Sequence, residues 1–191
     1  MAGGNWPFGD LNMFGYDLIM ADPPWKFDNW SAKGEHKNAS AKYDCMPLNE
    51  IKALPVGHLA SRDCLLWLWA THPLHREAFD VCDAWGFKYV TGGCWIKTTS
   101  KGNIAFGTGY RLRSASEPFL ICTNGNPETV KNVRTAFKGQ AREHSRKPEE
   151  GYAIAERYVP DARRLDLFSR QTRPGWDNWG NESTKFDEVA A

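Results

Sequence analysis

An apolar run that ends at two consecutive prolines is the feature that most limits how this chain can fold. Residues 16–21 read YDLIMA, and the tetrapeptide Asp22-Pro23-Pro24-Trp25 follows directly. The run predicts a buried strand that stops at the prolines. Such a strand carries a carboxylate at its carboxyl end, where open α/β sheets place their ligand crevices.

The four residues after this strand have chemistry that suits a planar amine. Asp22 is an acid, and neither Pro23 nor Pro24 has an N–H, which leaves their carbonyls as acceptors. Trp25 offers a flat apolar face with one donor. This set favours binding of the amino group of a nucleobase. The alternative is a strand that ends in a proline turn with a core tryptophan.

Strands and helices are predicted to alternate along the rest of the chain. We expect further strands over 65–70, 87–96, 117–123, 130–138 and 163–168, and helices that begin near Pro47, after Pro73 and at Pro148. The long polar segments 26–46 and 98–114 are predicted loops. This order predicts one α/β domain over residues 1–182, with a mostly parallel sheet flanked by helices. Residues 183–191 are expected to form a frayed tail.

A second acid lies near the end of the last predicted strand. Asp166 there can accept both hydroxyls of a ribose, and Arg170 and Asn181 can supply donors. Lys147, just ahead of a predicted helix, is placed to meet a small carboxylate. The chain has no glycine-rich phosphate loop, which disfavours a pyrophosphate or triphosphate ligand. A ligand with a ribose and a carboxylate but no phosphate cradle fits S-adenosylmethionine.

Several motifs occur in one order between residues 16 and 182. They are Asp22-Pro23-Pro24-Trp25, Leu66-Trp67-Leu68-Trp69, Cys94-Trp95-Ile96-Lys97, the segment His144 to Pro148, and the segment Leu165 to Arg170 followed by Gly175-Trp176 and Gly180-Asn181-Glu182. This ordered set resembles the methyltransferase-A-seventy family. That family contains the catalytic subunit of the mRNA adenosine methyltransferase and many bacterial and phage DNA adenine methyltransferases.

The resemblance implies a Rossmann-like class I S-adenosylmethionine-dependent methyltransferase in which the catalytic motif precedes the cofactor motif. It implies a catalytic role for Asp22 to Trp25. The cofactor residues that it implies are Lys147, Asp166, Phe168, Arg170, Asn181 and Glu182. The family often has Glu where Asp166 stands; the shorter acid still accepts from a ribose, with a different reach.

The function that follows is methylation of the exocyclic 6-amino group of adenine in DNA, in a bacterium or phage. The same reaction on RNA, methylation of a cytosine amino group, and a non-catalytic nucleic-acid-binding subunit remain the alternatives. Two basic stretches, 97–113 and 131–147, are expected to hold the nucleic-acid backbone; their alternative reading is two solvated loops. Lys97, Arg111 and Arg113 are the candidate backbone contacts, and Tyr43 is expected to close over the base.

Composition excludes several other classes. The net charge is +1, so the chain as a whole is no polycation. Its five cysteines are scattered and form no Cys-x-x-Cys pair, which argues against disulfides and structural zinc, and no metal is expected. No signal peptide or membrane-spanning run is apparent, so a cytoplasmic location is expected, with a homodimer as a possible assembly. Four of the nine tryptophans lie in polar, Pro/Gly-rich stretches and are expected to line a pocket: Trp25, Trp30, Trp176 and Trp179.

Overall fold

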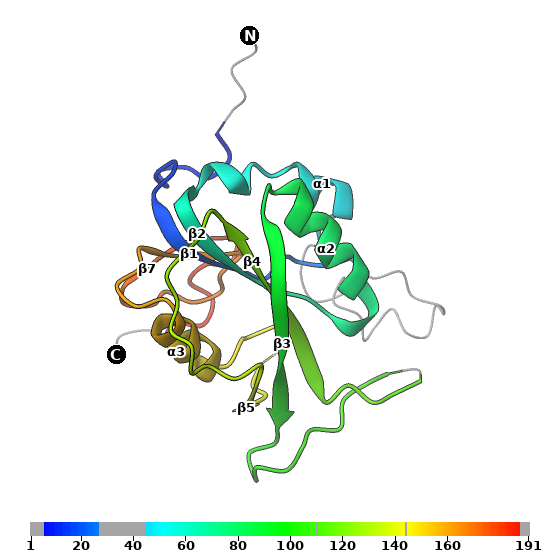
Figure 1. Ribbon diagram of the computed structural model, residues 1–191. Helices are drawn as coiled ribbons and strands as arrows, with labels where there is room; N and C mark the ends of the chain where they lie inside the picture. The colour runs from blue at the N-terminus through cyan, green and yellow to red at the C-terminus, as the bar shows by residue number, and fades with distance from the viewer. Residues whose placement is uncertain (1–5, 27–44, 110, 144, 188–191) are drawn as a thin grey trace.

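A single seven-stranded sheet with helices on both faces forms the body of the molecule (Figure 1). The computed structural model describes residues 6–26, 45–109, 111–143 and 145–187. The strands are β1 (Tyr16–Ala21), β2 (Ala60–Trp69), β3 (Lys88–Thr98), β4 (Ser116–Asn124), β5 (Ala136–Gln140), β6 (Arg164–Leu167) and β7 (Trp176–Trp179). The helices are α1 (Leu48–Ala53), α2 (His75–Ala84) and α3 (Glu149–Tyr158), with 3₁₀ turns at Val56–His58 and His72–Leu74.

The strand order is β5-β3-β4-β2-β1-β6-β7. Four neighbouring pairs are parallel, but β4 runs antiparallel to both β2 and β3. The predicted α/β class is therefore confirmed, while the sheet is mixed rather than parallel throughout. The reversal of β4 has a local consequence, because its first residues lie beside the carboxyl ends of β2 and β3.

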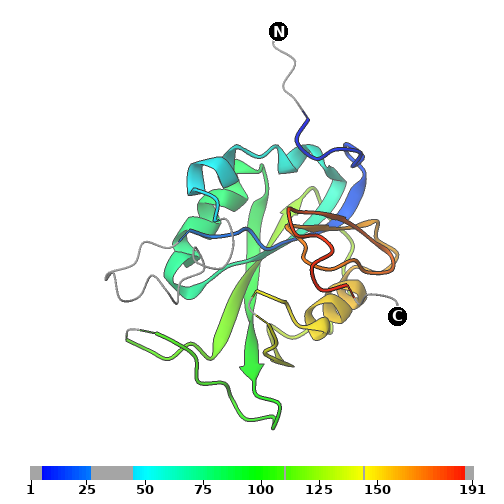
Figure 2. The ribbon, with the colours of Figure 1, turned by 180° about the vertical axis from the view of Figure 1, so that it is seen from behind.

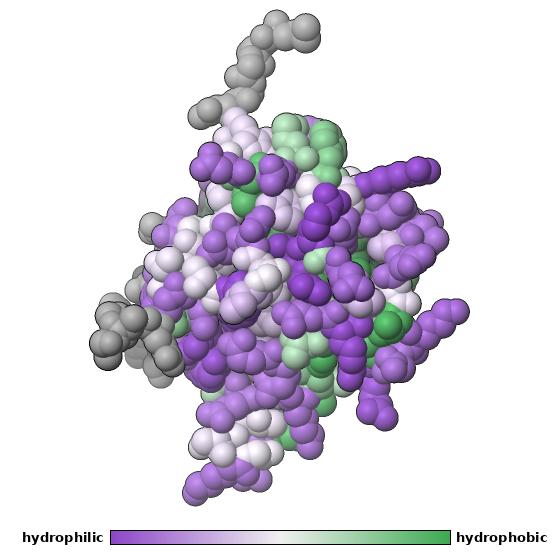
Figure 3. Space-filling view, turned by 90° about the vertical axis from the view of Figure 1, so that its left-hand side faces the viewer, coloured by the Kyte–Doolittle hydropathy of each residue, from purple (hydrophilic) through white to green (hydrophobic). Residues whose placement is uncertain are grey.

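Alternating side chains of the strands fill two separate cores, one on each face of the sheet. On one face Ile19, Leu66 and Leu68 pack with Ile51 of α1 and Val81 of α2. On the other face Leu18, Met20 and Trp67 pack with Tyr152 and Ala155 of α3. Because both faces are covered over Leu18–Ala21 and Cys64–Trp69, these parts of β1 and β2 read as continuous apolar runs in the sequence. The face seen in Figure 3, the left-hand side of Figure 1, is mostly hydrophilic.

The predicted elements are largely confirmed, with four differences. The strand expected over 130–138 begins only at Ala136, and β7 was not predicted. Helix α3 buries Gly151, Tyr152 and Ala155, whereas Ile154 and Tyr158, which the sequence predicts on one side of this helix, are only partly buried. Residues 183–187, expected in the frayed tail, form turns in which the Asp187 carboxylate accepts hydrogen bonds from the backbone and hydroxyl of Thr172.

The segment after β7 folds back over the end of β6, as the view from behind shows (Figure 2). The backbone N–H of Ser169 donates to the carbonyl of Trp179 at 3.1 Å. Gly180 allows this approach, because a Cβ there would lie 2.8 Å from the Ser169 carbonyl oxygen and 3.1 Å from the Phe168 Cα. A glycine is required at position 180 because its backbone lies against the backbone of Phe168 and Ser169. This contact fixes the position of those two residues just after β6.

We expect Gly180→Ala to destabilise the fold by roughly 1–3 kcal/mol, since the added methyl must push β7 away from β6. Thermal unfolding measures this as a lowered Tm. Thr184→Ala, an exposed change four residues further on, should stay within about 0.5 kcal/mol of the parent. Equal stability of the two variants would show that the contact around Gly180 is not tight.

Candidate active site

Asp22 and Asp166, the two strand-end acids, line one cavity. β1 and β6 are neighbouring parallel strands, and Met20 of β1 pairs with Asp166 of β6. The carboxyl ends of both strands therefore meet at one edge of the sheet. The cavity there holds about 300 Å³, including space open to solvent, and among its lining residues are Asp22, Lys147, Asp166, Phe168, Ser169, Arg170 and Arg173. The structure thus brings together most of the residues predicted to bind a cofactor with the predicted catalytic acid.

Lys147 joins Asp22 to a third acid. Its Nζ lies 2.5 Å from an Asp22 carboxylate oxygen and 2.8 Å from one of Glu117. Glu117 also pairs with Lys97 at 2.7 Å, so four charged side chains form a chain from the end of β1 to the end of β3. The Lys147 side chain is only 6% exposed, and its ammonium lies 5.5 Å from the centre of the Trp69 ring. Lys147, predicted to meet a cofactor carboxylate, is therefore already shared between two protein carboxylates.

Burial and charge act in opposite directions on these groups. Burial raises the pKa of Asp22; the charge of Lys147 opposes that rise and the charge of Glu117 adds to it. Burial by itself would also raise the pKa of Glu117, but Lys147 and Lys97 outweigh it and hold that pKa at about 2. Burial would lower the pKa of Lys147, yet Asp22 and Glu117 raise it above its usual value. Lys147 and Glu117 are therefore ionised near neutral pH, and the charge on Asp22 depends on Lys147.

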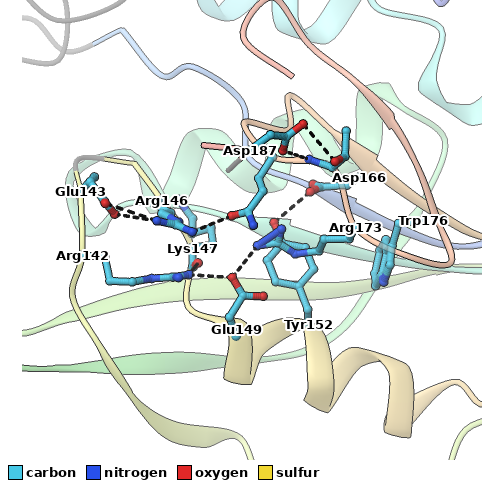
Figure 4. Close-up of polar contacts among 12 residues, drawn as sticks. Arg142, Glu143, Arg146, Lys147, Glu149, Tyr152, Asp166, Arg173, Trp176 and Asp187 are labelled. Atoms are coloured by element: carbon cyan, nitrogen blue, oxygen red, sulfur yellow. Dashed lines mark hydrogen bonds and ion pairs between the residues drawn. The ribbon is translucent and has the colours of Figure 1, made fainter. Parts of the chain in front are cut away.

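Asp166 has a different environment. It is buried, and the hydroxyl of Tyr152 on α3 donates to its carboxylate at 2.9 Å (Figure 4). Burial raises the pKa of Asp166 to about 7, against the opposing effects of the Tyr152 hydrogen bond and the charge of Arg173. The guanidinium of Arg173 lies over the Tyr152 ring, 3.6 Å from its centre. Near neutral pH this carboxyl is therefore partly ionised and able to accept from a ligand.

Two residues at the cavity adopt a backbone conformation that is uncommon for side chains with a Cβ. Ser145 has a φ of 63° and Phe168 a φ of 62°. Such left-handed residues cost on the order of 1 kcal/mol or more and cluster at functional sites. Next to Phe168, the buried Ser169 hydroxyl lines the cavity and has no hydrogen-bond partner among the described residues. The cavity thus offers a buried polar atom whose hydrogen-bonding capacity is unused.

The remaining predicted cofactor residues lie in two groups. Phe168 and Arg170 line the cavity. Glu182 forms an ion pair with Arg170 and a second one with Lys185, at 2.5 Å. Asn181 is exposed and does not line the cavity. The cofactor roles of these residues stay predictions, with Glu182 placed to orient Arg170.

Two expectations for the Asp-Pro-Pro-Trp segment are wrong. The proline carbonyls are not free, because Pro23 accepts the N–H of Trp25 at 2.8 Å and Pro24 accepts that of Met46 at 2.9 Å. Trp25 is only 3% exposed; it packs in the core and donates to the Trp69 carbonyl at 3.3 Å. The two carbonyls accept backbone amides of later residues, Trp25 and Met46, and the apolar Trp25 ring is buried in the core rather than exposed to the cavity.

The other tryptophans from polar stretches also differ from expectation. Trp176 is only 7% exposed and packs in the core beside α3. Its indole N–H donates to a Glu156 carboxylate oxygen at 2.7 Å. Trp179 is partly buried and packs edge to face against Phe8 and Phe168. Neither is among the residues that line the cavity. Trp30 lies outside the described residues.

The predicted nucleic-acid contacts lie on the long connection between β3 and β4 or at its start. Lys97 lies at its base and is paired with Glu117, rather than held out toward solvent. Arg111 and Arg113 are exposed further along, and Arg113 lies 5.3 Å from the centre of the Phe106 ring. This connection projects from the body of the molecule (Figure 1). Tyr43 lies outside the described residues, so its role stays a prediction.

Three residues of the site were missed by the sequence analysis: Glu117, Tyr152 and Arg173. Glu117 was read as the start of a strand, and it reaches Lys147 because β4 is reversed in the sheet. Tyr152 could have been found from the apolar spacing of Tyr152, Ala155 and Val159, which mark the buried side of α3. Arg173 lies in an irregular segment, and no local pattern points to its place.

Within the described residues, no three His, Cys, Asp or Glu side chains gather as a metal site would need. No described helix is both long and apolar enough to cross a bilayer.

Comparison with known proteins agrees with this geometry. The sequence model of the MT-A70 family matches residues 16–182, from the start of β1 to Glu182. The chain belongs to the MT-A70 family. The match includes both strand-end acids, Lys147 and Glu117, and it confirms the resemblance drawn from the ordered motifs.

Relatives of different kinds share this domain. The type II methyltransferase M.MunI of a Mycoplasma species is 30% identical over 189 residues, covering 87% of this chain and 77% of that protein. An N(6)-adenosine-methyltransferase MT-A70-like protein of Arabidopsis thaliana is 33% identical over 93% of this chain. The human N(6)-adenine-specific methyltransferase METTL4 is 28% identical over 91% of this chain. The chain spans about a quarter of the Arabidopsis protein, 26%, and 39% of METTL4.

The raised pKa of Asp166 predicts a pH-dependent stability. Its folded pKa of about 7 exceeds the unfolded value near 3.9, so its contribution to stability is complete below about pH 4 and is lost as the pH rises through about 7. Between pH 5.5 and 8.5 we expect the parent to lose roughly 2 kcal/mol more stability than Asp166→Asn. Urea unfolding at both pH values measures this difference. The same loss in both proteins would mean that Asp166 titrates normally.

Proposed function

We propose that this protein transfers a methyl group from S-adenosylmethionine to the exocyclic 6-amino group of adenine in DNA. The observation that carries the proposal is the shared cavity of Asp22 and Asp166 at the carboxyl ends of neighbouring strands. Asp166 suits the hydroxyls of a sugar, and Asp22 suits an amino nitrogen. Membership of the MT-A70 family supports the same reaction.

The residues around the cavity fit S-adenosylmethionine. The Asp166 carboxylate would accept from the ribose hydroxyls, and Arg170 would supply a donor to the same part of the ligand. The unpartnered Ser169 hydroxyl and the buried guanidinium of Arg173 offer further polar contacts. When bound, this cofactor supplies an electrophilic methyl group on a sulfonium. Phe168 and its strained backbone form part of the wall against which the ligand would lie.

Asp22 would act on the target amine. The adenine 6-amino nitrogen is a weak nucleophile, because its lone pair is delocalised into the ring. A hydrogen bond from this amino group to Asp22 would favour a pyramidal nitrogen. Holding the amine in line with the methyl group contributes up to about 7–11 kcal/mol to the rate. Asp22 then stabilises the positive charge as it develops on the nitrogen, which afterwards loses its proton readily.

Lys147 and Glu117 would position Asp22 and set its charge. With Lys147 at 2.5 Å, Asp22 keeps one carboxylate oxygen occupied and the other available to the amine. Glu117 holds Lys147 from the opposite side and is held in turn by Lys97. Lys147 thus opposes the effect of burial, which raises the pKa of Asp22 and favours its neutral form.

We place DNA ahead of RNA because the type II methyltransferase M.MunI and the N(6)-adenine-specific methyltransferase METTL4 are among the relatives. RNA is the alternative substrate, since the Arabidopsis relative is named an N(6)-adenosine-methyltransferase. In duplex DNA the target base must leave the stack, at a cost of a few kcal/mol. Arg111 and Arg113 on the projecting β3–β4 connection would contact the backbone.

A methylation assay with labelled S-adenosylmethionine tests the proposal. The substrates are duplex DNA, single-stranded DNA and RNA, and mass spectrometry of the digested nucleosides identifies the product. We expect N6-methyldeoxyadenosine. N6-methyladenosine in RNA alone would move the substrate to RNA, methylated cytosine would change the target base, and no transfer to any substrate would support a non-catalytic role.

We expect Asp22→Asn to bind cofactor almost normally and to lose at least about 10²-fold in kcat, because the developing charge on nitrogen is no longer stabilised. Lys147 keeps Glu117 as a partner in this variant, which limits structural damage. Calorimetry with S-adenosylhomocysteine and single-turnover kinetics separate the two effects.

Asp17→Asn is the matched control, since Asp17 lies at the other end of the same strand and pairs with Arg163. It should keep its kcat, although it loses an ion pair. If Asp22→Asn lost cofactor affinity and kcat together, Asp22 would belong to the cofactor site instead.

A further inference from the structure

The connection between β3 and β4 carries the most exposed large apolar side chains in the part of the chain that the structure describes. Leu112 is 86% exposed and Phe106 is 80% exposed, and Ile104 on the same connection is exposed as well. Removing apolar side chains from water is favourable, so a group of them gathered in solvent at one place indicates a contact surface. The connection therefore has a surface suited to a partner that takes up apolar side chains.

Hydrogen bonds hold the backbone on both sides of Phe106. Before it, the N–H of Ala105 donates to the Lys97 carbonyl at 2.8 Å. After it, the N–H of Gly107 donates to the Ser114 carbonyl at 2.9 Å. Gly107 allows this close approach, because a Cβ there would lie 2.6 Å from the Ser114 carbonyl oxygen. The Phe106 ring is thus presented on an ordered backbone, which reduces the entropy lost when the ring binds.

The charge of the connection fits a polyanion. Residues 98–115 include three basic side chains, Lys101, Arg111 and Arg113, and no acidic one. The Arg113 guanidinium lies 5.3 Å from the centre of the Phe106 ring, so a cation and a flat apolar face stand next to each other. Nucleic acid offers a partner to both, a phosphate to the cation and a base to the ring. Two copies of this chain that met through this surface would bring like charges together.

The connection begins at the same edge of the sheet as Asp22. β4 is antiparallel to both β2 and β3, so β2 and β3 share one direction, and β2 is parallel to β1. The carboxyl end of β3 is therefore on the same side of the sheet as the carboxyl end of β1, which Asp22 follows. Figure 1 shows the connection projecting beyond this end of β3. A nucleic acid bound at Asp22 thus lies on the side from which the connection projects.

We propose that Phe106 and Leu112 insert into duplex DNA as an apolar wedge and fill the space that the target adenine leaves when it moves out of the stack. The inference rests on the proposed function and adds to it the way in which the duplex is opened. Moving a base out of a duplex is unfavourable, because its stacking and pairing are lost. Apolar side chains inserted between base steps replace part of the lost stacking. Arg113, beside the ring, contacts a phosphate next to the opened step.

Duplex and single-stranded forms of one methylated DNA sequence separate the wedge from the methyl transfer. A single strand has no duplex to open, so only the duplex needs the wedge. We expect Phe106→Ala to lower kcat/KM roughly 10- to 100-fold on the duplex and less than about threefold on the single strand. Single-turnover kinetics with labelled S-adenosylmethionine measure both rates. Phe106→Trp, which keeps a flat ring, should retain most of the duplex activity.

A mismatch opposite the target adenine gives a second measurement that a purely structural role of Phe106 would not affect. A mismatched base leaves the stack at a lower cost than a paired one. The mismatch should therefore restore most of the activity that Phe106→Ala loses on the paired duplex. An activity that stayed equally low on paired and mismatched duplexes would overturn the wedge.

Phe14→Ala is the matched control, because Phe14 is also an exposed phenylalanine but precedes β1, at the opposite edge of the sheet. It should leave both rates unchanged. Equal losses of Phe106→Ala on duplex and single strand, or no loss on either, would contradict the wedge. So would a parent dimer that this variant converts to a monomer in sedimentation, since Phe106 would then join two copies of the chain.

The parent protein separates failure of the wedge from failure of the proposed function. Methylation of single-stranded DNA or of RNA, with none on the duplex, would remove the wedge and leave the methyl transfer. No transfer to any nucleic acid would contradict the proposed function, and the wedge with it.

Discussion

The ion pair between Lys147 and Asp22 is the interaction on which the rest of the site depends. Its two residues lie 125 positions apart in the sequence, and the pair joins the end of β1 to the start of α3. In a buried setting each of these charges would be unfavourable alone, so neither can be removed without disturbing the other. β1 lies inside the sheet, with β2 and the reversed β4 on one side and β6 on the other, so Asp22 at its end is surrounded by the ends of other strands. Catalytic charge and tertiary structure are thus maintained by the same contact.

Much of the fold and part of the site follow from local sequence patterns. β1 and its end were predicted correctly, because the four residues from Leu18 to Ala21 are apolar on both faces and the prolines follow Asp22 directly. Asp166 could be placed beside Asp22 because parallel strands align their carboxyl ends. β7 was missed, since Trp176–Trp179 is a short edge strand with two polar residues among its four. The antiparallel direction of β4 could not be predicted from the sequence, because an apolar strand has the same residue pattern in either direction.

The errors at Trp25 and the proline carbonyls have a common cause. A residue type reveals which interactions a side chain can make, but the three-dimensional surroundings decide which it does make. The Trp25 ring is buried in the core, and the two proline carbonyls accept the backbone amides of Trp25 and Met46. Conversely, Glu117 and Arg173 became part of the site through contacts with residues distant in the chain. Such long-range partners leave no trace in a local motif.

Glu117 gives the molecule one more property. Its carboxylate is held by Lys147 on one oxygen and by Lys97 on the other, and Lys97 lies at the base of the projecting β3–β4 connection. A polyanion that drew Lys97 away would leave more of the Glu117 charge for Lys147, and so weaken the hold of Lys147 on Asp22. By thermodynamic reciprocity, whatever changes the protonation of Asp22 must alter the affinity for that polyanion by the same factor. Ion pairing at the base of the β3–β4 connection and the protonation of Asp22 are therefore linked equilibria, joined through a single shared carboxylate.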